Sequence, residues 1–95
     1  MKLDKWTAKA LVAINNLSKD NTDLYFDISS ISSEVWKINR DRRVNYMYMN
    51  ISKAVSVLCK YDLLDTKGNG YRINAKGLVI LNDSLSFIRS MNIEL

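Results

Sequence analysis

The sequence predicts a mainly α-helical domain of the α+β class that carries one small β-hairpin. Apolar residues recur at helical spacing in four segments of the chain. Between the third and fourth of these segments, two short extended runs flank the turn sequence Lys-Gly-Asn-Gly at 67–70, which is typical of a hairpin. A further strand-like run between the first two helices gives the predicted order α-β-α-α-β-β-α. With 95 residues, no proline and no linker-like stretch, the chain is expected to form a single domain over residues 1–95.

The composition argues against a membrane-spanning or secreted protein. The chain is 47% hydrophobic and 25% charged, as is usual for a globular domain. Its longest apolar run, residues 10–14, is far shorter than the ~20 residues that a bilayer-spanning helix needs. Asp4 stands where a secretory signal would have its apolar core. We therefore expect no membrane partner and a cytoplasmic location.

The residue types that most catalytic and metal sites require are scarce in this chain. One cysteine and no histidine exclude a disulfide framework, a zinc–thiolate cluster and the most common general base. The three glycines lie in the hairpin and just after it, so the sequence has no phosphate-cradling glycine loop. Asp20, Asp23 and Asp27 lack the spacing and the final glutamate of a calcium loop. We therefore expect a protein that is not an enzyme and that binds no metal or cofactor.

Positive charge is concentrated in the middle of the chain, although the net charge is only +4. Residues 37–76 contain nine basic and three acidic side chains, whereas residues 1–36 and 77–95 each carry a net charge of −1. A basic segment between nearly neutral flanks indicates a surface that faces a polyanion. An ordinary solvated surface would spread the lysines more evenly.

The first half of the chain is expected to form a helix, a strand and a second helix. The first helix begins at Asp4 or Lys5 and ends before the polar loop 18–23. Residues 24–28 are short, aromatic and bounded by turn residues, so they are predicted to form a small strand. Ser29 or Ser30 is the expected cap of the second helix, because a serine hydroxyl can accept a hydrogen bond from the first turn. The predicted core residues of these segments are Trp6, Ala10, Ala13, Ile14, Leu17, Phe26, Ile31, Val35, Trp36 and Ile38.

The third helix, expected to start at Asp41, separates its residues into two faces. The apolar ones fall within an arc of about 100° and form the predicted core face: Val44, Met47, Ile51, Ala54, Val55 and Leu58. The opposite arc holds small polar groups, two lysines and one methionine: Asn45, Met49, Ser52, Lys53, Ser56 and Lys60. No acid occurs between Asp41 and Asp62, whereas a water-facing helix usually carries charges of both signs.

A last helix is predicted over residues 75–91, with two apolar stripes. The stripe expected to face the core consists of Leu78, Leu81, Leu85 and Ile88. Ile80, Phe87 and Met91 lie roughly 120° away and are expected to find no partner inside so small a domain. Because exposed apolar patches usually mark interfaces, these three residues are predicted to form a homodimer interface. The alternative is that the first helix covers them.

The order of elements over about residues 5–90 resembles that of winged helix-turn-helix DNA-binding proteins. The most specific part is Leu-Cys-Lys-Tyr-Asp-Leu-Leu at 58–64, followed by the hairpin and by Tyr-Arg-Ile-Asn-Ala-Lys-Gly at 71–77. These segments look like the end of the recognition helix, the wing and the entry to the last helix in MarR-like and PadR-like regulators. The resemblance implies a recognition helix at about 41–61 in the DNA major groove, a wing at about 63–74 on the neighbouring backbone, and dimer contacts through 75–91.

The function that the resemblance implies is sequence-specific binding of double-stranded DNA by a homodimeric, small transcriptional regulator. Small solitary winged helices are familiar from archaeal viruses and plasmids, and ten asparagines and nine isoleucines against five alanines indicate an AT-rich genome. A viral origin would place the protein in the host cytoplasm. The alternative function is that of a winged-helix module for protein–protein contact, without DNA binding.

Three features depart from the family pattern and leave the subfamily open. Asp62 occupies the place where the family usually has glycine, which predicts a less sharp turn. The wing is short, and the basic connection before the third helix is longer than the 3–4-residue turn of a tight helix-turn-helix.

The candidate DNA-binding residues come from the basic connection, the third helix and the hairpin. They are Arg40, Arg42, Arg43, Asn45, Tyr46, Tyr48, Met49, Ser52, Lys53, Ser56, Lys67, Asn69 and Arg72. Asparagine pairs with adenine and lysine with guanine, whereas arginines at a helix N-terminus suit a phosphate. The alternatives are a solvated helix face, arginines paired with acids such as Asp41 or Glu34, and a plain solvated turn. Cys59 is expected to be a small buried hydrophobe, with an intermolecular disulfide as the alternative.

Overall fold

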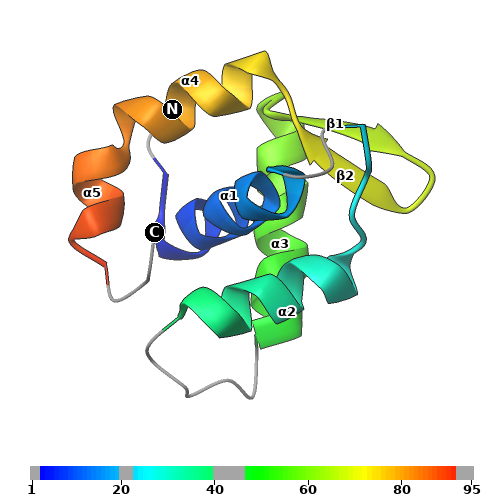
Figure 1. The fold of residues 1–95 in the computed structure, drawn as a ribbon, viewed down its shortest axis with the longest axis horizontal. Helices are drawn as coiled ribbons and strands as arrows, with labels where there is room; N and C mark the ends of the chain where they lie inside the picture. The colour runs from blue at the N-terminus through cyan, green and yellow to red at the C-terminus, as the bar shows by residue number, and fades with distance from the viewer. Residues whose placement is uncertain (1–2, 20–22, 40–46, 92–95) are drawn as a thin grey trace.

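A computed structural model describes residues 3–19, 23–39 and 47–91, which form five helices and one two-stranded antiparallel sheet (Figure 1). The elements are α1 (Lys5–Ser18), α2 (Ile28–Ile38), α3 (Met47–Lys60), β1 (Leu64–Lys67), β2 (Gly70–Ile73), α4 (Ala75–Asp83) and α5 (Leu85–Arg89). The predicted α+β class, mainly helical with one hairpin, is confirmed.

Helix α1 lies at the centre of the molecule, and the other elements pack around it (Figure 1). Residues 7–14 are all buried, so the helix is covered on nearly every side. It starts where expected: the Asp4 carboxylate accepts a hydrogen bond from the Thr7 backbone N–H at 2.8 Å, and the Thr7 hydroxyl accepts one from the Asp4 N–H at 2.9 Å. This reciprocal capping box satisfies backbone donors that would otherwise be unpaired at the helix start.

The segment before α2 is shorter than the predicted strand and caps the helix differently. Phe26 and Tyr71 of β2 exchange two backbone hydrogen bonds, of 2.8 and 2.9 Å, but residues 24–28 form no further ladder. The cap is Asp27 rather than Ser29 or Ser30, because its carboxylate accepts the Ser30 N–H at 2.8 Å. Asp27 is as good a cap as serine, and its position draws Ile28 into the helix.

The hairpin turn lies one residue earlier than the Asn-Gly pair that signals it in the sequence. Lys67 pairs with Gly70, which leaves Gly68 and Asn69 as a two-residue loop. Gly68 has a φ of +58° and Asn69 does not have a positive φ, the pattern of a type II′ turn. Gly70 has a different role, because a Cβ there would lie 2.6 Å from the Tyr25 Cβ. The segment that contains Tyr25 and Phe26 crosses beside Gly70, so this position requires glycine.

The predicted continuous helix over 75–91 is wrong, because the chain breaks at Ser84 into α4 and α5. Leu81 and Ile88 are buried as expected, but Leu78 is exposed. Ile80 and Met91, expected to have no partner in the domain, pack against the core. The two stripes assume one straight helix, and the break at Ser84 changes the direction of the residues after it. Each predicted stripe therefore contains both exposed residues and residues that pack in or against the core.

The core face of α3 is confirmed for its described residues, since Met47, Ile51, Ala54, Val55 and Leu58 are buried. Val44 lies outside the described residues. Trp6 and Phe26 pack against the core as predicted, whereas Trp36 keeps 40% of its surface exposed. Trp36 follows the buried Val35 on α2, and that one-residue offset places it beside the buried stripe of Ile31, Val35 and Ile38 rather than on it.

Candidate nucleic-acid interface

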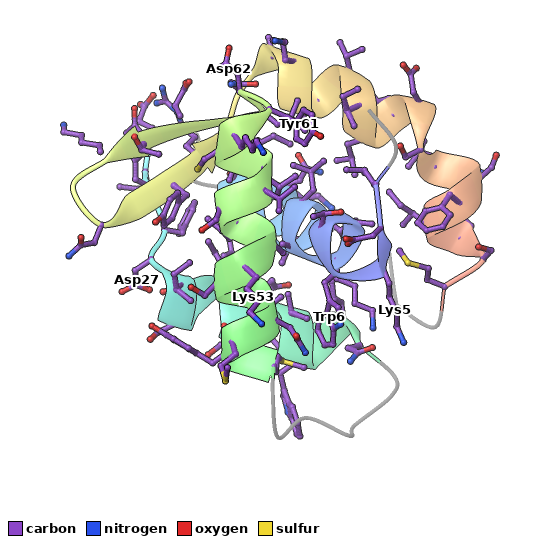
Figure 2. The ribbon with its side chains drawn as sticks, turned by 180° about the vertical axis from the view of Figure 1, so that it is seen from behind. Lys5, Trp6, Asp27, Lys53, Tyr61 and Asp62 are labelled. Atoms are coloured by element: carbon purple, nitrogen blue, oxygen red, sulfur yellow. The ribbon has the colours of Figure 1, made fainter. Side chains whose placement is uncertain are left out.

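The side of α3 that faces away from the core carries several of the predicted DNA-binding residues, and they are exposed together. Met49, Lys53, Ser56 and Lys60 are exposed, and Ser52 is half-buried. We call these five residues the outward face of α3. Figure 2 shows α3 in front of α1, with Lys53 on the near side of the helix. All the charges on this face are positive.

The end of α3 makes a sharp turn at Asp62, contrary to the expectation of a less sharp one. Asp62 itself adopts the left-handed conformation, with a φ of 61°. The Leu63 N–H donates to the Leu58 carbonyl and the Asp62 N–H donates to the Cys59 carbonyl, both at 3.0 Å. This pair of bonds is a Schellman motif, which usually has glycine at the left-handed position. Aspartate is one of the residues that tolerate that conformation locally, so the turn is kept.

A second set of hydrogen bonds ties the far end of the hairpin to the same turn. The Asn74 side-chain amide donates to the Asp62 carbonyl at 2.9 Å, and the Asn74 N–H donates to the Leu63 carbonyl at 3.2 Å. The Asn74 side-chain oxygen also accepts the Gly77 N–H at 2.9 Å and so caps α4. A Cβ at Gly77 would collide with the Leu63 carbonyl, so α4 packs against this turn only with glycine there. The hairpin is thereby held at a fixed angle to α3.

Two of the three candidate residues on the hairpin are exposed, and the third is engaged within the domain. Lys67 and Asn69 are exposed at the tip. Arg72 donates to the Asp65 carboxylate on the opposite strand at 3.3 Å, and its guanidinium lies 4.5 Å from the centre of the Tyr25 ring. Arg72 therefore contributes to the sheet surface, and Lys67 is the cation available at the tip.

A hollow of about 350 Å³ separates α3 from the hairpin tip. It brings together two predicted residues, Tyr48 from α3 and Asn69 from the turn, with Tyr71, Ser29 and Asp27. The hydrogen bond from the Ser30 backbone N–H holds the pKa of the Asp27 carboxyl below the ordinary 3.8. This side of α3 therefore presents hydroxyl and amide groups next to a negative charge, which suits uncharged polar groups better than a phosphate.

The other flank of α3 lies beside the start of α1. Asn50, Lys53 and Val57 share a small hollow with Asp4, Trp6 and Thr7, so an acid also lies on this flank. Figure 2 places Lys5 and Trp6 on the same side of the molecule as Lys53. Sequence reasoning did not place Lys5 on this side of the molecule, because its position depends on the packing of α1 behind α3.

Five of the predicted DNA-binding residues lie outside the described residues: Arg40, Arg42, Arg43, Asn45 and Tyr46. The described part of the third helix begins at Met47, and its expected start, Asp41, also lies outside the described residues.

A buried lysine joins α1 to the end of α2, a feature that the sequence did not reveal. Lys9 is 1% exposed, and its ammonium donates to the Asn39 side-chain oxygen at 2.9 Å. The same nitrogen lies 4.8 Å from the centre of the Trp6 ring, within the range of a cation–π contact. Asn39 is the C-cap of α2, so the contact ties α1 to the end of that helix. No local pattern signals it, because the two residues are 30 positions apart.

Cys59 is half-buried at the edge of the core rather than fully buried, and this burial raises the pKa of its thiol above the ordinary 9.0. Within residues 3–19, 23–39 and 47–91, no group of three or more acids or cysteines is placed to hold a metal ion. No helix in those ranges is long and apolar enough to cross a membrane. Comparison of the chain with protein families, with curated proteins and with solved structures found no match.

Proposed function

We propose that the protein is a winged helix-turn-helix protein that binds double-stranded DNA in a sequence-specific manner, as a small transcriptional regulator. In this proposal α3 enters the major groove and the hairpin is the wing, which contacts the neighbouring backbone. The observation that carries the proposal is the outward face of α3: an exposed surface whose only charges are positive, on a helix held at a fixed angle to a hairpin with Lys67 at its tip.

The arrangement of elements supports the winged-helix interpretation. The order of α1, the Phe26 bridge, α2, α3, the β1–β2 hairpin and α4 is the order of that fold. The Phe26 segment pairs with β2 rather than with β1, which places β2 in the middle and leaves β1 at the free edge. The hairpin can therefore extend beyond α3 while β2 stays paired with the Phe26 segment.

The dimensions of α3 suit the major groove. Its 14 residues extend about 21 Å, and the groove is about 12 Å wide, which admits one helix. Lys53 and Lys60 are seven residues apart, so they lie on one side of the helix, about 10 Å from each other. In this proposal Lys60 and Lys67 of the hairpin contact the phosphate backbone, while Met49, Ser52, Lys53 and Ser56 face the bases.

We further propose that the protein acts as a homodimer through the outer side of α4 and α5. Val79 on α4 and Phe87 on α5 are exposed apolar residues, at 58% and 39%. Of the three interface residues predicted from the sequence, only Phe87 is exposed. A two-fold dimer would place two copies of α3 about one DNA turn, ~34 Å, apart on a palindromic site.

Salt-dependent binding to selected DNA tests the main proposal. Fragments of the source genome would be selected on the immobilised protein, and the best one measured by fluorescence anisotropy at 50 and 200 mM salt. We expect the affinity to fall at least tenfold, because each neutralised phosphate contributes a log–log slope of about 0.9. Failure to select any fragment, or an affinity independent of salt, would reject DNA binding.

Light scattering tests the dimer separately. We expect the wild type to have the mass of a dimer, and Phe87→Asp to have that of a folded monomer, because a charge buried without a partner costs several kcal/mol. Asp83→Ala, a change at an exposed polar residue of α4, is the control that should remain dimeric. A monomeric wild type at micromolar concentration would contradict the proposal.

The second candidate function is a protein–protein interaction module, which the exposed side chains Leu78 and Val79 of α4 favour. That function predicts partner binding without salt-dependent DNA affinity, so the selection experiment separates the two.

A further inference from the structure

The outward face of α3 includes an exposed methionine that neither the core nor a phosphate contact accounts for. Met49 is 57% exposed and lies in the first described turn of the helix. Lys53 follows one turn later and Ser56 two turns later on the same face, and both are polar. An apolar side chain at this position adds nothing to the core, whose α3 residues lie on the opposite side.

We propose that Met49 recognises the methyl group of thymine, so that a thymine in the binding site lies opposite the first turn of α3. The inference rests on the proposed function and names the base that this part of the interface reads. Thymine is the only base that presents an apolar group, its C5 methyl, in the major groove. An unbranched, flexible thioether adapts its shape to such a group.

The chemistry of methionine also disfavours the other bases. Its side chain has no hydrogen-bond donor and only a weak acceptor. Opposite cytosine, the exocyclic amino group would lose its water without gaining a partner, which costs free energy. Opposite thymine, the side chain gains a contact with the methyl group at the same position in the groove. Thymine is therefore preferred to cytosine both by this contact and by the cost of burying the cytosine amino group.

The neighbouring lysine sets the spacing of the predicted site. Four residues of helix correspond to about 6 Å, and base pairs are stacked about 3.4 Å apart. If α3 follows the groove, Lys53 reaches a base about two pairs from the thymine. Lysine donates to the O6 and N7 acceptors of guanine, so the expected element is a thymine and a guanine separated by about one base pair.

Replacement of thymidine by deoxyuridine tests the inference, because it removes only the methyl group. Each thymidine of the selected fragment would be replaced in turn, and the affinities for wild type and Met49→Ala measured by anisotropy. At one position per half-site we expect a roughly three- to fivefold weaker affinity for wild type, the value of one buried methyl. Met49→Ala should lose a similar factor on the unmodified fragment and show no further loss with deoxyuridine.

Val57→Ala is the matched control, an apolar truncation on the flank of the same helix, and it should keep the full deoxyuridine effect. Far-UV circular dichroism would show that all three proteins are folded. Equal wild-type affinity for every deoxyuridine fragment, or an unchanged deoxyuridine penalty in Met49→Ala, would overturn the inference while leaving DNA binding intact. Failure to select any fragment would overturn the proposed function and this inference with it.

Discussion

Helices α1 and α3 are both 14 residues long but have opposite surroundings. In α1 every residue from 7 to 14 is buried, including a lysine. In α3 the buried residues recur every three or four positions, and the opposite side is exposed. The domain is therefore built around α1, while α3 stabilises it with one face and leaves the other free for a partner. This difference predicts that substitutions in α1 affect stability and that those on the outward face of α3 affect binding.

The largest expected effect is on the free energy of unfolding when the centre of α1 is truncated. Leu11 is fully buried, so Leu11→Ala should destabilise the domain by about 2–5 kcal/mol. Met49→Ala on α3 should change it by less than about 0.5 kcal/mol. Urea denaturation followed by circular dichroism measures both values. Similar losses in the two variants would contradict the contrast between the helices.

The next effect concerns the buried lysine of α1. Lys9→Ala removes the buried hydrogen bond to Asn39 and the cation–π contact with Trp6, so we expect a loss of about 1–3 kcal/mol in unfolding free energy. Lys5→Ala, a change at an exposed lysine in the same helix, is the control and should be nearly neutral. A Lys9→Ala variant as stable as the control would show that the Lys9–Asn39 contact does not stabilise the packing of α1 against the end of α2.

A smaller effect, an increase in the free energy of unfolding, is expected for a substitution at the end of α3. Asp62→Gly should raise the unfolding free energy by up to about 1 kcal/mol, because glycine adopts the left-handed conformation without the steric cost of a Cβ. Asp62→Ala should lower it, since alanine tolerates the left-handed conformation less well than aspartate does. The ion pair of Asp62 with Lys76, 3.8 Å and largely exposed, contributes little in either case. A lower stability of Asp62→Gly would contradict this interpretation of the turn.

The smallest effect is a pH dependence at the start of α2. The pKa of Asp27 is lower in the folded chain than its ordinary 3.8. Its stabilising contribution is therefore present above pH 3.8 and is lost as the pH falls through the lower, folded value. Asp27→Asn keeps a capping oxygen but does not titrate. The difference in Tm between wild type and Asp27→Asn should shrink on acidification from about pH 5 to about pH 2.5, and a difference that is constant over this range would contradict the assignment.

The outward face of α3 could be predicted from the sequence because it follows from local periodicity. Met49, Lys53 and Ser56 share an arc in any regular helix, and the absence of acids is visible without a structure. The hairpin could also be predicted, because its turn sequence is a local signal. The turn itself is Gly68-Asn69, and Gly70 is required for a different reason, the close approach of Tyr25.

The features that could not be predicted depend on contacts between distant residues. The burial of Lys9 requires Asn39, and the engagement of Arg72 requires Tyr25 as well as the opposite strand. The break at Ser84 changes which C-terminal residues reach the core, and no proline or glycine marks it in the sequence. Periodicity describes one element at a time, whereas these features arise from how the elements meet.

The central claim, that the outward face of α3 binds DNA, is tested most directly by removing its two lysines. Lys53→Ala/Lys60→Ala would be compared with Lys19→Ala/Lys37→Ala, which removes the same charge from exposed residues outside α3, the hairpin and the proposed dimer interface. Affinity for the selected fragment would be measured by anisotropy from 50 to 200 mM salt. We predict at least tenfold weaker binding for the α3 variant and a log–log salt slope reduced by about 0.9, the value of the one phosphate contact made by Lys60, with wild-type values for the control. Equal affinities and slopes for the two double variants would contradict the claim.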